Sequence, residues 1–367
     1  MVLDRASDIV TAATTSNDAL LSKLSALRAG YLVDPALRAI HTKPSLPRKD
    51  PMINRGTWFR FTYIEQMAVA FAAKYNGNCA IVNIGAGLDT LYWRLQLTAQ
   101  QEKKEGKQSY FHVKHWIEID LPSITELKAK KFDLTHGEII NMPVSEDTTI
   151  RPFQEPQVIL YRPKQEHAET VPEALRVELP GYRLYAANLE MRKTWMPMVR
   201  DIVANDKGDA TLPVLFLSEV CLSYLDADTT IGIIKDLPTY FNSFGIVCFE
   251  MVNPSDSFGE MMQINMAERQ VVMPSFVELG FTAQYRKIFQ LNGYEDSYAR
   301  EAGDVYRSFW PARRREIEQL ELFDEFEQWN LIMGHYACIM GWTGVTNLEE
   351  MLNSIGQDTE SPDAPDK

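Results

Sequence analysis

"AIVNIGAGLDTLYWRL", residues 80–95, is typical of a buried strand that runs directly into a glycine turn and then into a helix. Gly85 and Gly87 have no β-carbon, so the chain can turn sharply here and its backbone can approach a ligand closely. Turns that hold a dinucleotide place a third glycine beside the pyrophosphate, but Thr90 stands at that position. A ligand without phosphates, such as S-adenosylmethionine, suits this turn better than a dinucleotide. A plain tight turn is the alternative.

Apolar segments on either side of this stretch alternate between strand-like and helix-like patterns. Strands are expected at 115–120, 182–189, 213–220 and 245–252, and helices at 6–29, 57–75, 121–130, 191–205 and 229–244. Such alternation predicts an α/β fold with a doubly wound, mostly parallel sheet and helices on both of its faces.

One domain is expected to span residues 1–355. Its first part, about 1–56, is expected to form a lid of helix and loop, in which the stretch 33–56, dense in proline and basic residues, is extended. The section from about 133 to 180 is rich in proline and charge and is interpreted as a surface insertion. The acidic, proline-bearing end, 356–367, is expected to be a disordered tail.

Composition excludes several classes of function. The chain has 50 acidic and 37 basic residues, a net charge of −13, which disfavours a nucleic-acid partner. No continuous apolar run is long enough to span a membrane, so a soluble, intracellular protein is expected, cytoplasmic with a nuclear location open. The four cysteines lie far apart in apolar segments, and the six histidines form no HExxH pattern. We therefore expect neither a disulfide framework nor a metal site.

Polar residues stand at the ends of the predicted strands, where ligands bind in an open α/β sheet. Asp120 ends "WIEID", where a carboxylate can accept hydrogen bonds from two ribose hydroxyls; Glu118 is the other candidate there. Glu219 ends "LFLSE", with Tyr224 following, and its alternative is a solvated strand-end carboxylate. Asn188 ends "RLYAAN", where its amide faces an adenine edge or starts the next helix.

Arg60 is flanked by aromatic residues in "NRGTWFRFT" and is expected on a largely buried helix face. A buried guanidinium needs an anionic partner, either a ligand carboxylate or an internal salt bridge. His335 lies within the apolar "MGHYACIMGW" and is expected to be a hydrogen-bonded core histidine rather than a catalytic base.

Six blocks follow one another along the chain: "PMINRGTWFRFTYIEQMAVAF", "CAIVNIGAGLDTLYWRL", "WIEIDLPSITELKAKKF", "LFLSEVCLSYL", "FEMVNPSDSFGEMM" and "FDEFEQWNLIMGHY". Together they resemble the leucine carboxyl methyltransferases that act on the catalytic subunit of type 2A protein phosphatases. The resemblance extends from about Lys23 to Thr343. It implies a class I S-adenosylmethionine-dependent fold and methyl esterification of the phosphatase's C-terminal leucine carboxylate.

The resemblance also implies the residues of the cofactor site, which are Lys23, Arg60, Gly85, Asp120, Asn188, Leu189 and Glu219. Gly87 joins them through the glycine turn. Tyr224 is implied to lie near the cofactor and the substrate carboxylate, and Arg60 and Tyr224 are the candidates for orienting both carboxylates. The family often has "ADL" where this chain has "ANL", so an amide at Asn188 replaces a carboxylate.

A leucine α-carboxylate, with a pKa of about 3.5, is ionised at neutral pH and needs no general base to attack a methyl group. Catalysis is then expected to consist of aligning the carboxylate oxygen, methyl carbon and sulfonium sulfur and of excluding water. No His/Asp dyad is needed for such a reaction, and none occurs in the motifs.

Other functions stay open at this point. The fold also suits an O-methyltransferase of small carboxylic acids, a noncatalytic partner-binding protein and, more distantly, an NAD-dependent dehydrogenase. A related methyltransferase of tRNA wybutosine synthesis carries a propeller, whose roughly 40-residue repeats are not seen in this sequence.

Overall fold

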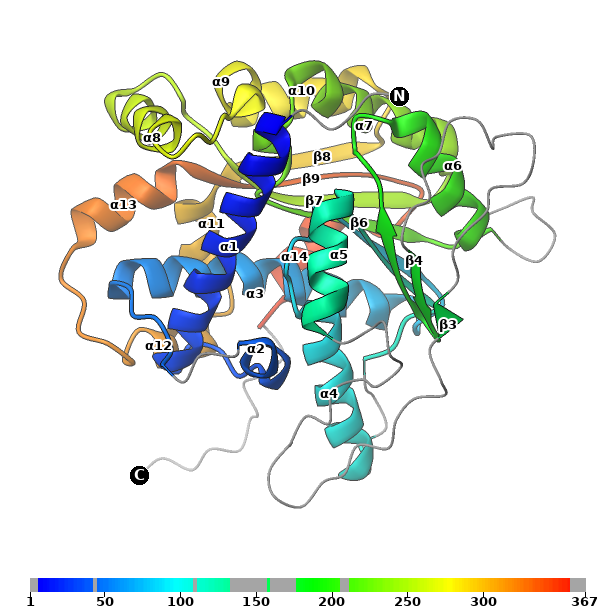
Figure 1. Ribbon diagram of the computed structural model, residues 1–367, viewed down its shortest axis with the longest axis horizontal. Helices are drawn as coiled ribbons and strands as arrows, with labels where there is room; N and C mark the ends of the chain where they lie inside the picture. Colours follow the sequence, from blue (N-terminus) through cyan, green and yellow to red (C-terminus); the bar gives the residue numbers. More distant parts are fainter. Residues whose placement is uncertain are drawn as a thin grey trace.

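The computed structural model describes residues 6–41, 45–107, 111–132, 157–158, 176–204 and 211–356. Nine strands of this part form one sheet in the order β3-β4-β5-β2-β1-β6-β7-β9-β8. Figure 1 shows the sheet crossing the molecule, with helices packed above and below it. No helix in the described ranges combines the length and apolarity needed to cross a lipid bilayer.

Five parallel strands form the centre of the sheet. In spatial order they are β5 (Tyr182–Ala186), β2 (His115–Asp120), β1 (Ala80–Ile84), β6 (Val214–Glu219) and β7 (Phe244–Met251). The chain proceeds outward from β1 through β2 to β5 and then returns to the other side of β1 for β6 and β7. The strand order therefore reverses between β1 and β6, and the carboxyl ends of strands at such a switch point form a ligand-binding crevice.

Antiparallel strands extend both edges. β9 (Tyr336–Thr343) lies between β7 and β8 (Asp296–Glu301), and β4 (Arg176–Leu179) lies between β5 and β3 (Gln157–Val158). The centre remains parallel, so the predicted α/β class with a mostly parallel, doubly wound sheet is confirmed.

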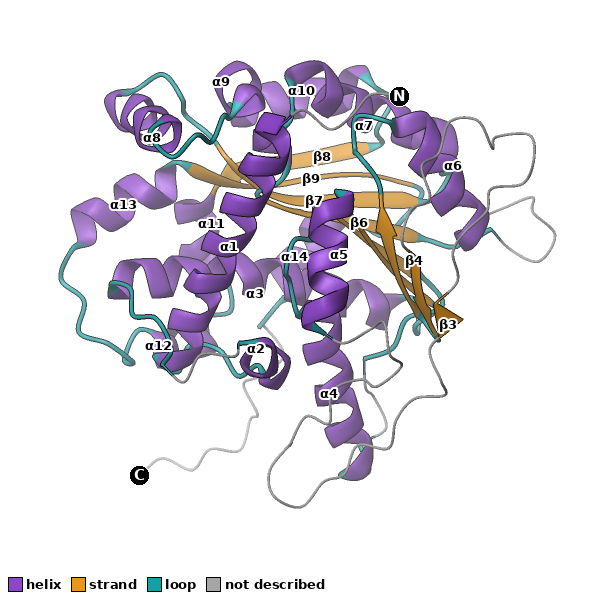
Figure 2. Cartoon of the chain, viewed as in Figure 1, coloured by secondary structure: helices purple, strands orange, loops and turns teal. Residues whose placement is uncertain are grey.

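The alternating residues of the strands divide the core into two layers. In β1, Ile81 belongs to the hydrophobic cluster on one face of the sheet, whereas Val82 and Ile84 belong to the cluster on the other. Successive side chains of a strand point to opposite faces, so an unbroken apolar run marks a strand covered on both. Figure 2 shows these two helical layers.

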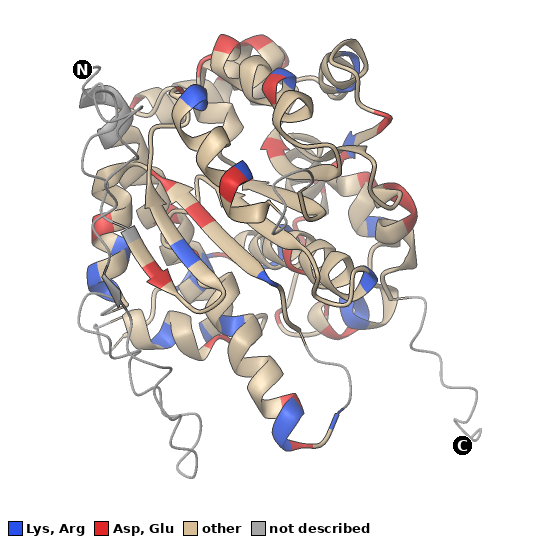
Figure 3. Ribbon diagram, turned by 90° about the vertical axis from the view of Figure 1, so that its right-hand side faces the viewer, with Lys and Arg blue, Asp and Glu red and all other residues tan. Residues whose placement is uncertain are grey.

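Helices of the N-terminal third cover the first face, and α6, α7 and α10 cover the second. The helices are α1 (Ala6–Arg28), α2 (Pro35–Ile40), α3 (Pro51–Lys74), α4 (Leu91–Lys104), α5 (Pro122–Lys131), α6 (Arg192–Val203), α7 (Ala227–Tyr240), α8 (Ser257–Ala267), α9 (Pro274–Leu279), α10 (Thr282–Leu291), α11 (Ala302–Ser308), α12 (Pro311–Ile317), α13 (Phe326–Gly334) and α14 (Leu348–Ser354). Acidic and basic residues are interspersed over the side of the molecule seen in Figure 3.

The expectation of an extended chain over 33–56 was wrong. α2 occupies part of this stretch, and α3 starts at Pro51, earlier than the predicted residue 57. Each helix begins with a proline that follows an aspartate. Proline breaks a helix in its interior but is favoured in the first turn, where its missing N–H and fixed φ carry no penalty.

The predicted insertion is described only in part. Its last residues form β4, which pairs with β5, so this end of the segment belongs to the sheet instead of a surface excursion. Most of 133–175 and the predicted tail beyond Gly356 lie outside the described residues.

Two strands near the end of the chain, β8 and β9, were not predicted from sequence patterns. β8 is a polar edge strand, and β9 follows directly on the apolar helix α13.

Candidate active site at the carboxyl ends of the parallel strands

Two adjacent cavities lie at the switch point between β1 and β6. The larger, of about 390 Å³, is lined by six of the predicted site residues: Lys23, Arg60, Gly85, Gly87, Glu219 and Tyr224. The smaller, of about 200 Å³, is lined by Asp120, Asn188 and Leu189 and again by Gly85 and Tyr224. The structure thus brings all nine predicted site residues to one place. Both cavities are also lined by Thr15 and Ser16 of α1, the helix that crosses the strands in Figure 1.

The two glycines of the turn both have a positive φ, but they differ in how closely other residues pack against them. Gly85 has φ +65°, and a β-carbon on it would lie 2.2 Å from Cys221 Sγ, in the turn that follows β6. Gly87 has φ +50°, but its β-carbon would meet only Ser16 Oγ at 3.4 Å. Gly85 therefore makes room for a neighbouring turn of the protein as well as for a ligand.

Asp120 is tied to the same glycine turn. Its Oδ2 accepts a hydrogen bond from the Gly87 N–H at 2.6 Å, and its Oδ1 accepts one from the Leu121 N–H at 2.7 Å. Burial raises the pKa of Asp120, and these two hydrogen bonds oppose that shift. A carboxylate has further lone pairs, so Asp120 can still accept hydrogen bonds from hydroxyls in the smaller cavity.

Glu118, the other acidic candidate, has a different environment. It is fully buried, its Oε2 lies 2.6 Å from Lys128 Nζ, and the same oxygen accepts a hydrogen bond from the Tyr182 hydroxyl at 2.7 Å. It lines neither cavity. Glu118 therefore holds α5 against the sheet, and Asp120 is the acid that faces the site.

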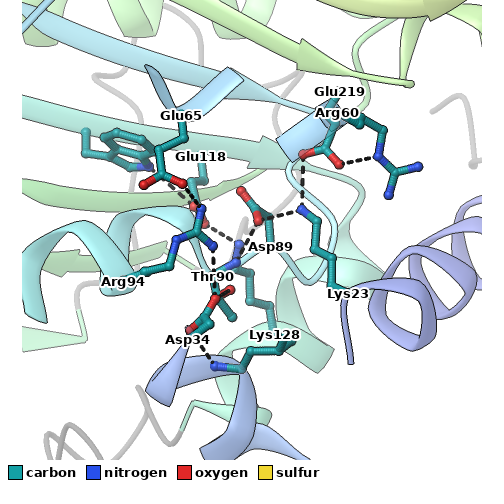
Figure 4. Close-up of polar contacts among 12 residues, drawn as sticks. Lys23, Asp34, Arg60, Glu65, Asp89, Thr90, Arg94, Glu118, Lys128 and Glu219 are labelled. Atoms are coloured by element: carbon teal, nitrogen blue, oxygen red, sulfur yellow. Dashed lines mark hydrogen bonds and ion pairs between the residues drawn. The ribbon is translucent and has the colours of Figure 1, made fainter. Parts of the chain in front are cut away.

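A chain of alternating charges crosses the larger cavity (Figure 4). Lys23 Nζ lies 2.8 Å from Asp89 Oδ1 and 3.0 Å from Glu219 Oε2, and Arg60 Nε lies 2.8 Å from Glu219 Oε1. Burial alone would lower the pKa of Lys23, but the two carboxylates outweigh it and hold that pKa above its ordinary value. Burial likewise opposes ionisation of Asp89, yet Lys23 brings the pKa of Asp89 down to about 2.

Arg60 therefore has Glu219 as an internal salt-bridge partner, which is one of the two alternatives that the sequence left open. The pairing uses Nε only, and Arg60 Nη2 is a buried atom with no hydrogen-bond partner among the described residues. Figure 4 shows this end of the guanidinium pointing away from Glu219. A buried donor without a partner is costly, so Arg60 retains the capacity to bind an anion in the cavity.

Thr90, at the position of a third glycine, and the preceding Asp89 connect the turn to the N-terminal segment. Asp89 binds Lys23 of α1, and the hydroxyl of Thr90 donates a hydrogen bond of 2.5 Å to Asp34, which caps α2. Arg94 reaches the same Asp34 carboxylate at 3.1 Å. Side chains of the protein thus occupy the helix start that would face a pyrophosphate in a dinucleotide site.

The turn after β6 is strained at one position. Val220, directly after Glu219, has φ +53°, which is unfavourable for a β-branched residue and costs about 1–3 kcal/mol. Val220 and Tyr224 line both cavities. Burial raises the pKa of Tyr224, so its phenol stays protonated and can donate a hydrogen bond.

Asn188 does not start the next helix, as one interpretation had it, because α6 begins at Arg192 with Met191 at its N-cap. Asn188 Oδ1 accepts a hydrogen bond from the Glu190 N–H at 2.9 Å, which is a turn contact, while the residue also lines the smaller cavity. His335 is buried and contacts Asp256 Oδ1 and the Leu331 carbonyl oxygen at 2.8 and 2.7 Å. It lines neither cavity, so the expected core histidine is confirmed.

The family model described as leucine carboxyl methyltransferase matches residues 5–237, more than half of the chain. The chain belongs to this family. The leucine carboxyl methyltransferase 1 homolog of Arabidopsis thaliana is 27% identical over 325 residues, which cover 88% of this chain and 86% of that protein. The leucine carboxyl methyltransferase 1 of Emericella nidulans is 27% identical, with coverages of 94% and 89%.

Solved methyltransferase structures are more distant. The plantazolicin methyltransferase BamL, in complex with a triazolic substrate analogue and SAH, covers 90% of this chain and 99% of its own, with a TM-score of 0.40 and 10% identity. The family membership rests on the match to the family model. It confirms the resemblance inferred from the six blocks and the methyltransferase fold that the resemblance implied.

Sequence reasoning missed two residues that bind parts of this candidate site. Asp89 binds Lys23, but no local pattern of the glycine turn marks it as the partner of a residue in α1. Glu250 of β7 accepts hydrogen bonds from the turn after β6. Its signal was present in "GIVCFEMV", where one acid stands inside an otherwise apolar strand and therefore needs buried donors.

Gly85→Ala is expected to destabilise the protein more than Gly87→Ala. A positive φ costs an alanine about 1 kcal/mol at either position, and the contact with Cys221 adds about 1–3 kcal/mol at position 85. Urea denaturation of the two variants measures the difference. Equal losses of unfolding free energy would contradict the close packing of the two turns.

Asp89 is expected to make stability sensitive to acid. Its folded-state pKa of about 2 lies below the ordinary 3.8, so its charged form stabilises the fold at higher pH, and this contribution is lost as the pH falls toward 2. The difference in unfolding free energy between the parent protein and Asp89→Asn should shrink by about 2 kcal/mol as the pH falls from about 4 to about 2. Urea titrations at several pH values test this, and a constant difference would argue against the Lys23–Asp89 pair.

Proposed function

We propose that this chain transfers the methyl group of S-adenosylmethionine to the C-terminal leucine carboxylate of the catalytic subunit of type 2A protein phosphatases. The observation that carries the proposal is the unpartnered Nη2 of Arg60 in the larger cavity of a leucine carboxyl methyltransferase. This cavity adjoins a second one lined by Asp120, Asn188 and Leu189. An anion site beside a site suited to a nucleoside is what carboxyl methylation requires.

The residues present fit the cofactor. The bare backbone of Gly85 and Gly87 gives room for the amino-acid portion, and Asp120 has acceptor capacity for ribose hydroxyls. Leu189, which is buried, gives the smaller cavity an apolar wall for a base. When bound, S-adenosylmethionine supplies an electrophilic methyl group.

The chain's own contribution is positioning. The substrate carboxylate is ionised at neutral pH, so no residue has to remove a proton from it. Arg60 can bind a carboxylate through the nitrogens that Glu219 leaves free, and the protonated Tyr224 phenol can donate one directed hydrogen bond. α1, whose residues line both cavities, excludes water from the ionised oxygen.

The activity is tested by incubating the protein with methyl-labelled S-adenosylmethionine and the phosphatase catalytic subunit. Label should appear on the intact subunit, should be released by mild alkali as expected of a methyl ester, and should be absent from a subunit that lacks its C-terminal leucine. Labelling of free small carboxylic acids alone would identify a small-molecule methyltransferase, and labelling of tRNA alone would identify an RNA enzyme. Cofactor binding without any transfer would favour a noncatalytic partner-binding protein.

Arg60→Ala is expected to reduce kcat/KM by about 100-fold or more, because it removes the cation that orients the carboxylate. Arg60→Lys keeps the charge without the planar fork and should fall between the variant and the parent. The melting temperature should change by less than about 4 °C, since Glu219 keeps Lys23 as its partner when Arg60 is removed. Near-normal turnover of a folded Arg60→Ala protein would remove this residue from the mechanism.

A further inference from the structure

Glu250 is a fully buried carboxylate near the carboxyl end of β7, and its side-chain hydrogen bonds are directed at the end of β6 and the turn after it. Its Oε1 accepts hydrogen bonds from the Ser218 hydroxyl at 2.8 Å and from the N–H groups of Cys221 and Leu222 at 3.1 and 3.0 Å. Its Oε2 accepts from the N–H and the hydroxyl of Ser223 at 3.1 and 2.8 Å. Five donors from the end of β6 and the turn after it therefore converge on one side chain.

These donors bracket the residues that face the cavities. Ser218 precedes Glu219, and the 3₁₀ turn η2 (Leu222–Tyr224), which begins with Leu222, ends with Tyr224. Between them the chain passes through Val220 in its left-handed conformation. A β-branched residue keeps such a conformation only where its surroundings enforce it.

The same hydrogen bonds also act on the glycine turn. Cys221, whose N–H is held by Glu250, is the residue whose Sγ would lie 2.2 Å from a β-carbon on Gly85. Glu250 itself lines neither cavity. Through these hydrogen bonds Glu250 sets the positions of three parts of the site without lining a cavity. They are the Glu219 carboxylate, the Tyr224 phenol and the cavity wall beside Gly85.

We propose that Glu250 is a positioning residue for methyl transfer, which holds the turn after β6 so that Glu219 and Tyr224 present their polar groups to the cofactor and the substrate carboxylate. The proposal rests on the proposed function for its reaction. It assigns to Glu250 an effect on the geometry of the site beyond its effect on folding. A carboxylate suits this role because it accepts hydrogen bonds through both oxygens and donates none.

Glu250→Gln is the informative variant, because it keeps the size of the side chain and replaces one acceptor oxygen by an amide NH₂. That group cannot accept from the N–H groups it would face, so the turn must shift. We expect the dissociation constant for S-adenosylmethionine, measured by calorimetry, to rise about tenfold, and kcat/KM to fall by at least as much. A purely structural role would lower the fraction of active protein and hence the binding stoichiometry, but it would leave the dissociation constant of the folded fraction unchanged.

Tyr294→Phe is the matched control. This substitution also removes a buried hydrogen bond, the one that the Tyr294 hydroxyl donates to the Ile234 carbonyl oxygen at 2.9 Å. Tyr294 lines neither cavity. The dissociation constant of Tyr294→Phe for S-adenosylmethionine should equal that of the parent.

The double variant Glu250→Gln/Glu219→Gln tests whether Glu250 acts through Glu219. If it does, the losses of cofactor affinity from the two single substitutions should be less than additive.

Three results would overturn the proposal: a folded Glu250→Gln protein with the parent's dissociation constant and kcat/KM, a loss equal to that of Tyr294→Phe, or full additivity with Glu219→Gln. If Glu250→Gln does not fold, Ser218→Ala removes one donor to Glu250 and leaves the carboxylate in place. It should weaken cofactor binding about threefold, and parent-like binding would then decide against Glu250. If the parent binds S-adenosylmethionine but methylates no phosphatase, the proposed function fails while the affinities still decide the role of Glu250.

Discussion

The Lys23 ammonium between the carboxylates of Asp89 and Glu219 is the interaction on which the arrangement of the site depends. It joins three parts of the fold: helix α1, the glycine turn after β1 and the end of β6. All three side chains are largely buried, so water can replace only part of their mutual stabilisation. Removing one member of such a pair typically costs about 3–5 kcal/mol, because it leaves a buried charge without a partner. The ion pairs therefore fix α1 over the carboxyl ends of the strands.

This arrangement explains why the glycine turn departs from a dinucleotide site. A turn that binds pyrophosphate keeps its helix start open, so that backbone N–H groups and the helix dipole face the phosphates. Here Asp89 and Thr90 bind Lys23 and Asp34 of the N-terminal segment instead. The segment covers the site and contributes a cation to it. A ligand with a carboxylate and a sulfonium group is better matched to such surroundings than a ligand with two phosphates.

The site contains charged and polar groups but needs no proton-transfer residue. Arg60 and Tyr224 offer donors, and Glu219 fixes one side of the Arg60 guanidinium. Glu250 accepts hydrogen bonds from the turn after β6, which connects Glu219 to Tyr224. Positioning of this kind supplies rate only if the groups are held rigidly, because small displacements misalign the reacting atoms. Val220 keeps an unfavourable positive φ because the hydrogen bonds on either side of it hold the turn in place. The turn is therefore held rigidly at a cost in local backbone energy.

The amino-acid sequence by itself determined the fold class and the location of the candidate site. Both follow from local patterns: unbroken apolar runs mark strands buried on two faces, and parallel strands bring Asp120, Glu219 and the glycine turn to one edge of the sheet. Only the tertiary structure decided which groups are partners. Lys23 meets residues 66 and 196 positions away, and Cys221 packs against Gly85. The partner of a buried charge and the neighbour of a glycine come from distant segments, and no local periodicity of the chain carries that information.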